Sequence, residues 1–155
     1  MPCIVVGPLD SGGGGVGIFY RSSRLKVVDI TAKENQHEVI AVLCSLRGTS
    51  RKIICICGYL TTALTTDQSE AYLEYINDLI HSCKSRYQDP HILVAGDWNR
   101  ADTDIALCDF PSICRVPTPP TRGDEVLDII NMNYAVTETE ICPPLSEPRK
   151  AWSTE

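Results

Sequence analysis

Positive charge is scarce in this chain. Its 155 residues include 14 Lys and Arg residues against 20 Asp and Glu residues, which gives a formal net charge of -6. This balance excludes the broad basic surface that non-specific binding to nucleic acids usually needs. We therefore expect any contact with DNA to be local or assisted by a metal ion.

Long apolar runs are also missing, and no segment approaches the ~20 residues that a membrane-spanning helix requires. The opening stretch MPCIVVGPLD has a short apolar run and no basic region, so it lacks the pattern of a secretory signal peptide. We expect an intracellular protein whose eight cysteines are reduced thiols.

Metal-ligating motifs of the zinc type are absent from the sequence. No Cys-x-x-Cys occurs, and His37, His81 and His91 stand apart without ligand spacing. Both facts argue against a structural zinc site. Cys55 and Cys57 alternate with isoleucines in KIICICGY, which is typical of small apolar side chains on one face of a strand.

The pattern of apolar residues predicts strands, then one helix, then strands again. An antiparallel run is expected over residues 16–21, 25–30, 38–47 and 51–60, which are rich in β-branched residues. From Thr66, apolar residues recur at three- and four-residue spacing, which predicts a helix capped by Asp67 that ends before Asp89.

The second half of the chain predicts fewer elements. HILVAGD, residues 91–97, is typical of a strand buried on both faces. Residues 101–124 predict a long irregular connection, which in a compact domain is more often functional than idle. Two last strands are expected over 125–131 and 134–141. The order of elements predicts one α/β layered domain.

A glycine-rich stretch, SGGGGVG, places Gly12, Gly14 and Gly17 at the spacing of a dinucleotide-binding fingerprint. That fingerprint requires a following helix, whose N-terminus holds the pyrophosphate. Here the following residues predict a strand. We therefore interpret the stretch as a flexible turn.

Asp97 and Asn99 close the strand in LVAGDWNR. In an extended segment, residues two apart project to the same side, so a carboxylate and a carboxamide would leave the strand end together. Their oxygens could serve a metal ion, a water or a phosphate group. A turn capped by one of the two side chains explains the local sequence equally well.

A second carboxylate, Asp128, lies between apolar residues in EVLDIIN. A lone carboxylate in a core costs several kcal/mol, to order of magnitude, unless it has a partner. A catalytic role and a local bond, for instance to Arg122, both remain open.

Three motifs then occur in an informative order: CGYL at 57–60, VAGDWN at 94–99 and PPTRGDEVLDII at 119–130. Together they resemble the endonuclease/exonuclease/phosphatase superfamily, and more narrowly the endonuclease domain of non-LTR retrotransposons. The resemblance implies an α/β fold in which a two-sheet β-sandwich, partial in this chain, is flanked by helices. It covers residues 11–145, with residues 1–10 as a leader and 146–155 as a frayed tail.

The resemblance also implies an activity, which is Mg²⁺-dependent hydrolysis of phosphodiester or phosphomonoester bonds, with DNA as the partner. Asp97 and Asn99 match residues that orient the attacking water and bind the scissile phosphate, and Tyr59 matches a tyrosine that hydrogen-bonds the phosphate. Asp128 matches an aspartate that orients a catalytic histidine. Thr121 and Arg122 match a loop on the substrate side.

Two departures from the family pattern stand out. The family's metal-binding glutamate has no counterpart ahead of the glycine run, and no histidine follows His91 to partner Asp128. We therefore expect a truncated copy in which the endonuclease activity is impaired or lost. The alternatives are residual Mg²⁺-dependent nicking of DNA and a phosphatase of the same superfamily. Missing strands would also expose sheet edges and favour self-association.

Overall fold

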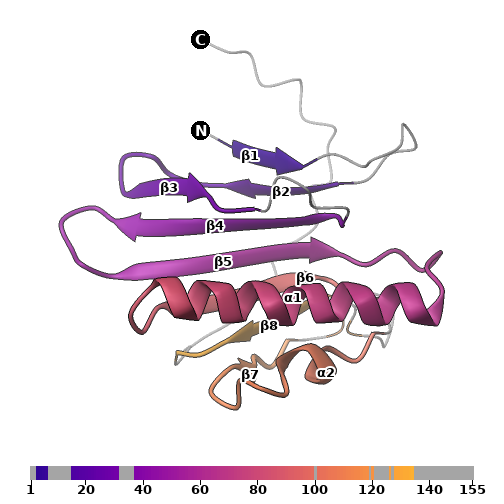
Figure 1. Ribbon diagram of the computed structural model, residues 1–155. Coiled ribbons are helices and arrows are strands. Elements are labelled where there is room, and N and C mark those ends of the chain that lie inside the picture. Colours follow the sequence, from indigo (N-terminus) through magenta and orange to yellow (C-terminus); the bar gives the residue numbers. More distant parts are fainter. Residues whose placement is uncertain are drawn as a thin grey trace, which may run out of the picture.

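The computed structural model describes residues 3–6, 15–31, 37–99, 101–118, 120, 126 and 128–134. These residues form a six-stranded sheet, a separate two-stranded sheet and two helices. Figure 1 shows α1 lying across one face of the large sheet, with α2 beside its lower edge. This arrangement confirms the expected α/β class with two sheets flanked by helices.

The large sheet has the strand order β3-β4-β5-β6-β8-β7. Its strands are β3 (Leu25–Asp29), β4 (Val39–Leu46), β5 (Lys52–Tyr59), β6 (His91–Asp97), β8 (Asp128–Met132) and β7 (Cys114–Arg115). The β5–β6 pair is parallel and the other pairs are antiparallel. The parallel pair follows from the helix between these two strands, because a crossover returns the chain to the same end of the sheet.

The two faces of the sheet carry different side chains, as the alternation in β5 predicts. Ile54 and Ile56 are fully buried on the face that packs against α1. Cys55 and Cys57 lie on the other face, in a cluster with Val16 of β2 (Val16–Phe19). The predicted placement of the two cysteines on one face is therefore confirmed.

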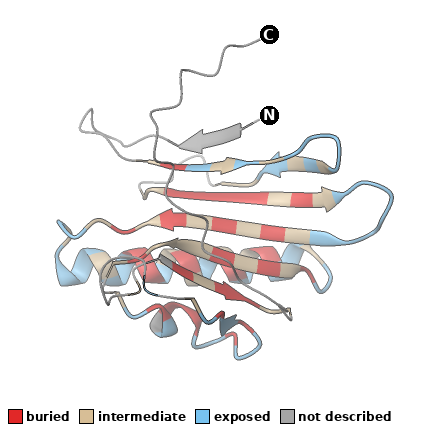
Figure 2. Ribbon diagram, turned by 180° about the vertical axis from the view of Figure 1, so that it is seen from behind, coloured by how far each residue is buried: buried red, intermediate tan, exposed pale blue. Residues whose placement is uncertain are grey.

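Helix α1 (Thr66–Arg86) buries one side from Tyr72 to Cys83 against the sheet, which lies in front of the helix in Figure 2. Its buried residues include Tyr72, Ile76 and Ile80. Full burial of a side chain of this size contributes about 1.5–3 kcal/mol. The N-cap is Thr65 rather than the predicted Asp67, because Thr65 and Gln68 form a reciprocal capping box.

Several elements differ from the sequence predictions. Strand β2 pairs with β1 (Cys3–Val6), within the expected leader, so the antiparallel run of the large sheet begins only at β3. Residues 101–124 include the short helix α2 (Thr103–Leu107) and β7. Strand β6 alternates between buried and half-buried residues instead of being buried on both faces. The last predicted strand, apart from Tyr134, and the tail lie outside the described residues.

The structure shows free thiols at Cys44, Cys55, Cys57, Cys83, Cys108 and Cys114. The Sγ atoms of Cys44 and Cys55 are 4.0 Å apart, well beyond the ~2.05 Å of a disulfide bond. Within the described ranges, no helix combines the length and apolar character needed to cross a membrane.

Candidate functional site

Three of the predicted site residues lie in one row across the large sheet. Tyr59 ends β5 and is the register partner of Asp97, which ends the parallel strand β6. Asp97 is in turn the register partner of Asp128, the first residue of β8. For Asp128 the structure describes the backbone position. The row lies at the carboxyl ends of two parallel strands, where α/β sheets commonly bind ligands.

Two glycines allow the strands to approach closely just before this row. Gly58 and Gly96 are register partners in β5 and β6. A Cβ atom at Gly96 would collide with the carbonyl oxygen of Gly58, and one at Gly58 would collide with the hydroxyl of Tyr72. A Cβ at Gly58 would also lie 3.2 Å from the ring of Trp98. Neither position therefore accepts a larger residue without movement of its neighbours.

The chain turns immediately after Asp97. Asn99 has φ +50°, in the left-handed region, and its backbone N–H donates to Asp97 Oδ1 at 3.0 Å. The extended backbone that we predicted from Asp97 to Asn99 is therefore wrong, and the alternative of an Asp-capped turn is confirmed. Trp98, 1% exposed, anchors the turn by packing edge-on against Tyr72.

Each of the two polar side chains of the turn has one oxygen with no hydrogen bond to the described residues. Asn99 Nδ2 donates to the carbonyl oxygen of Leu60 at 2.5 Å, so the amide is held with its Oδ1 on the other side. Among the described residues, neither Asp97 Oδ2 nor Asn99 Oδ1 has a hydrogen-bond partner. These two half-buried oxygens are able to accept hydrogen bonds or to ligate a hard cation.

A depression of about 390 Å³ opens beside the row. Tyr59, Asp97 and Ile130 line it from the large sheet. Gly15, which precedes β2, and Gly17, which lies within β2, line it from the other side. Because the two glycines have no side chains, they leave this side of the depression open. The glycine stretch thus leads into a strand, as we expected, and its described glycines form one wall of the cleft.

The donor chemistry in the cleft suits magnesium. Mg²⁺ prefers oxygen ligands, keeps several waters, and is commonly held by one or two carboxylates together with substrate phosphates. Asp97, which lines the cleft, offers Oδ2 as a ligand of this kind. Asn99 Oδ1 is a similar oxygen, but Asn99 lies in the adjoining turn and not in the lining of the cleft. Within the described part of the chain, no group of three His, Cys, Asp or Glu side chains is placed to hold a metal ion without substrate.

The remaining predicted residues are not part of this row. Thr121 and Arg122 lie outside the described residues. Asp102, from the connection that we expected to be functional, caps α2 by accepting from the N–H of Asp104. In the same connection, hydrogen bonds from His81 and Asn77 lower the pKa of Asp109, far from the cleft.

Sequence reasoning missed Glu38, which precedes β4 next to the row. Its carbonyl oxygen accepts from the N–H of Tyr59 at 3.0 Å and from the hydroxyl of Tyr72 at 3.3 Å. Burial raises the pKa of Tyr72, which keeps this donor protonated. Glu38 Oε2 is shielded from solvent and unpaired within the described ranges. A carboxylate at the head of an apolar run was the one available signal.

The sequence matches no protein-family model and no curated protein. Solved structures with a similar fold include the catalytic domain of human nocturnin with a bound sulfate anion. This match has 15% identity and a TM-score of 0.61, and it covers 85% of this chain and 60% of that chain.

Two further matches have a TM-score of 0.57. One is an endonuclease/exonuclease/phosphatase family protein from Bacteroides thetaiotaomicron, at 12% identity over 84% of this chain and 59% of that chain. The other is the endonuclease domain of TRAS1, a telomere-specific non-LTR retrotransposon, at 17% identity over 83% of this chain and 66% of that chain. This chain thus spans 59–66% of the length of the three structures. It has the fold of the endonuclease/exonuclease/phosphatase proteins, as its sequence motifs predict.

Proposed function

We propose that this chain is a retrotransposon-type endonuclease domain in which phosphodiester hydrolysis is impaired. The observation that carries the proposal is the row of Tyr59, Asp97 and Asp128 at adjacent strand ends, beside an open cleft. The similarity of fold to the TRAS1 endonuclease domain supports it. A hydrolase of phosphate esters needs groups that bind the phosphate and groups that orient water, and this row offers both.

Each side chain has a role that its geometry permits. Asp97 Oδ2 accepts a hydrogen bond from the attacking water and so orients it towards phosphorus. Asn99 Nδ2 has two N–H groups, of which Leu60 takes one, so the other donates to a phosphate oxygen. The hydroxyl of Tyr59 donates to a second phosphate oxygen. Magnesium, when bound beside Asp97 Oδ2 and Asn99 Oδ1, supplies charge neutralisation for the phosphate.

We infer the impairment from the sequence, in which no histidine follows His91 to partner Asp128. All three histidines of the chain are described, and each has other contacts: His37 with the rings of Tyr72 and Tyr75, His81 with Asp109, and His91 with Tyr134. A positioned acid or base typically contributes ~10²–10⁴-fold to a rate, so we expect hydrolysis slower by about this factor than in a complete site.

Plasmid nicking tests the proposal. With magnesium, the chain is expected to convert supercoiled plasmid slowly into the nicked form, and EDTA is expected to stop the reaction. Asp97→Ala is expected to lower the rate by about 100-fold or more, because it removes the group that orients the water. Glu70→Ala, which removes an equal charge from an exposed position on α1, is the matched control. Nicking that survives Asp97→Ala unchanged would contradict the proposal.

A second candidate function is a non-catalytic domain that acts by self-association. The observation in its favour is strand β3, which is an edge of the large sheet and carries the 45% exposed Val28. Exposed apolar edge strands template pairing with another chain. Absence of nicking, together with a dimer that Val28→Lys dissociates in sedimentation experiments, would favour this candidate. Release of phosphate from a phosphomonoester, without nicking, would indicate a phosphatase instead.

A further inference from the structure

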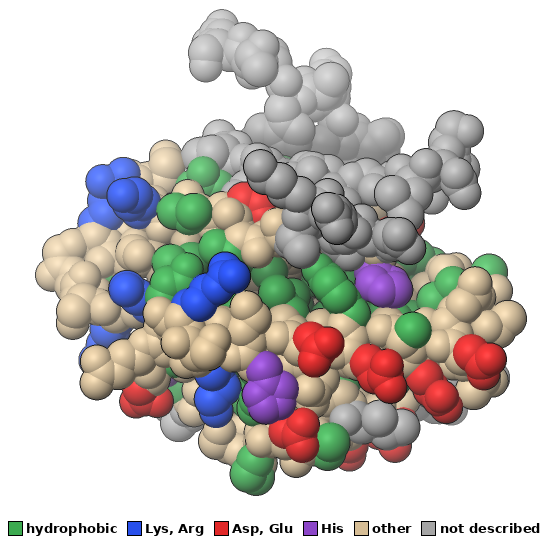
Figure 3. All heavy atoms as spheres, viewed as in Figure 1, with side chains coloured by type: hydrophobic (Ala, Val, Ile, Leu, Met, Phe, Trp, Pro, Cys, Tyr) green, Lys and Arg blue, Asp and Glu red, His purple; other side chains and the backbone are tan. Residues whose placement is uncertain are grey.

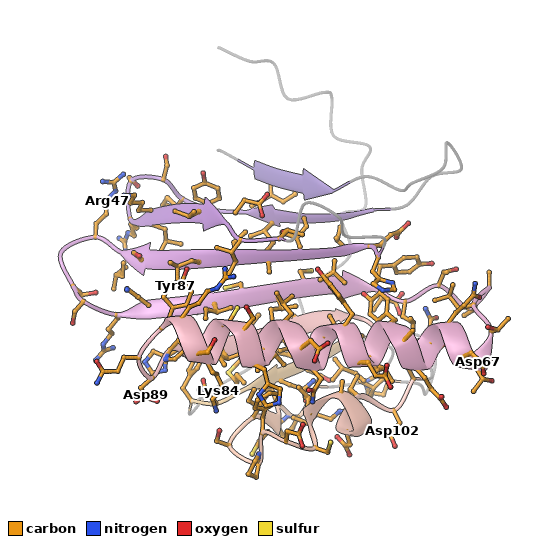
Figure 4. The ribbon with its side chains drawn as sticks, viewed as in Figure 1. Arg47, Asp67, Lys84, Tyr87, Asp89 and Asp102 are labelled. Carbon is orange, nitrogen blue, oxygen red and sulfur yellow. The ribbon has the colours of Figure 1, made fainter. Side chains whose placement is uncertain are left out.

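Most of the Lys and Arg residues that the structure describes gather at one end of the large sheet. We call this surface the basic end, and it comprises the exposed residues Arg21, Arg24, Arg47, Arg51, Lys52 and Arg86. Figure 3 shows blue side chains at the left of the molecule and red ones along α1 towards the right. Figure 4 places Arg47, Lys84 and Asp89 at the first end and Asp67 and Asp102 at the other.

The topology builds the basic end from separate turns. Arg24 precedes β3, Arg47 follows β4, and Arg51 precedes β5. Because neighbouring strands lie about 4.8 Å apart, these three arginines span about 10 Å across the strand ends. The backbone N–H of Arg47 donates to the carbonyl oxygen of Arg24 at 3.0 Å, and Arg47 Nε donates to that of Ser22 at 3.1 Å. The two turns are therefore fixed to each other.

Arg24 and Arg51 of the basic end are available to a partner, whereas Lys52 Nζ lies 5.3 Å from the centre of the Tyr87 ring. Within the described ranges, no Lys or Arg side chain forms an ion pair with a carboxylate, and the ion pair present there joins His81 to Asp109. A depression of about 420 Å³ adjoins the arginines of the basic end. Its lining consists of Ser50, Arg51, Lys52, Gln88, Asp89 and His91. Asp89 is the one acidic side chain in this lining.

We propose that the basic end binds the phosphate backbone of a nucleic acid. Arginine predominates there, and its planar guanidinium matches phosphate oxygens in a bidentate way. Phe19, 66% exposed, lies two residues before Arg21 and offers a ring on which a base can stack. The net negative charge does not prevent this, because at physiological ionic strength charges more than about 8 Å apart are largely screened.

The basic end is distinct from the cleft. Lys52 and Tyr59 are the first and last residues of β5, so the two sites lie about 23 Å apart at ~3.3 Å per residue. Binding at the basic end therefore does not rest on the proposed hydrolysis. It positions a nucleic acid along the molecule whether or not the cleft is active.

The test measures binding of short labelled DNA by fluorescence anisotropy over a range of salt concentrations, in EDTA so that no magnesium occupies the cleft. For a duplex, each lost phosphate contact lowers the slope of log affinity against log salt by about 0.9. We expect this decrease for Arg51→Gln and about twice this decrease for Arg24→Gln/Arg51→Gln. Arg115→Gln removes an equal charge on β7, away from the basic end, and is expected to leave the slope unchanged.

Four outcomes would overturn the proposal. These are an absence of DNA binding, equal loss in Arg51→Gln and Arg115→Gln, binding to anionic lipid vesicles in place of DNA, and binding that depends on Asp97 but not on Arg51. Retention of binding in Asp97→Ala, with loss in both basic-end variants, supports the basic end independently of any result on nicking. Both arginines are exposed and carry no described side-chain bonds, so the variants are expected to fold.

Discussion

Gly58 gives the sharpest test of the packing that holds the row in place. The Cβ atom that Gly58→Ala adds would collide with the hydroxyl of Tyr72 and lie 3.2 Å from the ring of Trp98. Overpacking of this kind costs about 1–3 kcal/mol. In a domain of this size, each kcal/mol lowers Tm by roughly 2–4 °C, so we expect a decrease of roughly 2–12 °C.

A double-mutant cycle isolates the collision. Tyr72→Phe removes the hydroxyl and its bond to Glu38, at a cost of about 0.5–1.5 kcal/mol. In the double variant with Gly58→Ala, it also removes the clash. The double variant is therefore expected to lose at least about 0.5 kcal/mol less stability than the sum of the losses in the two single variants. Gly96→Ala meets the backbone of Gly58 instead, and Tyr72→Phe is not expected to relieve it. Urea denaturation measures the free energy of unfolding of the three single and two double variants. Strict additivity of Gly58→Ala and Tyr72→Phe would refute the reasoning.

Two further predictions concern the turn and the thiols. Asn99→Ala is expected to destabilise the chain by about 1–2 kcal/mol, because alanine disfavours φ +50°; Asn99→Gly is expected to cost less in urea denaturation, and equal costs would contradict this. Exposed Cys108 and Cys114 are expected to react with a thiol reagent well before Cys57 and Cys83, since burial raises the pKa of the latter two. Uniform labelling in mass spectrometry would contradict it.

The longer strands and helix α1 were predictable because their apolar patterns repeat over many residues. Strand β5 alternates over eight residues and α1 repeats over 21, so one irregular position does not hide either pattern. Helix α2 has five residues and β1 has four, which is too short for a period to emerge. The pairing of β2 with β1 is a tertiary choice that no local pattern contains.

The site was predictable in its residue types but not in its geometry. The motifs around Tyr59, Asp97 and Asp128 identify the three residues, but their common row depends on the registers of β5, β6 and β8. The turn at Asn99 required a choice between two conformations that the sequence allows equally. Glu38 was missed because a single carboxylate before a strand resembles an ordinary exposed residue.

The charge distribution shows a similar limit. Composition excludes a broad basic surface, and the structure agrees, since acidic side chains occupy the right-hand part of the face in Figure 3. Arg24 lies in one turn of the basic end, and Arg47 and Arg51 lie about 25 residues later in another, so their proximity appears only when β3, β4 and β5 are paired.

The central claim is that the row formed by Tyr59, Asp97 and Asp128 binds a phosphodiester group. Proton–nitrogen correlation NMR tests it most directly, because the side-chain amide of Asn99 gives its own signal. On addition of magnesium and a short DNA duplex, we predict that this signal and the backbone amides of Tyr59 and Asp97 shift most, and that Asp97→Ala abolishes these shifts. The claim would be contradicted if these signals do not shift on addition of magnesium and DNA, or if they shift equally in Asp97→Ala.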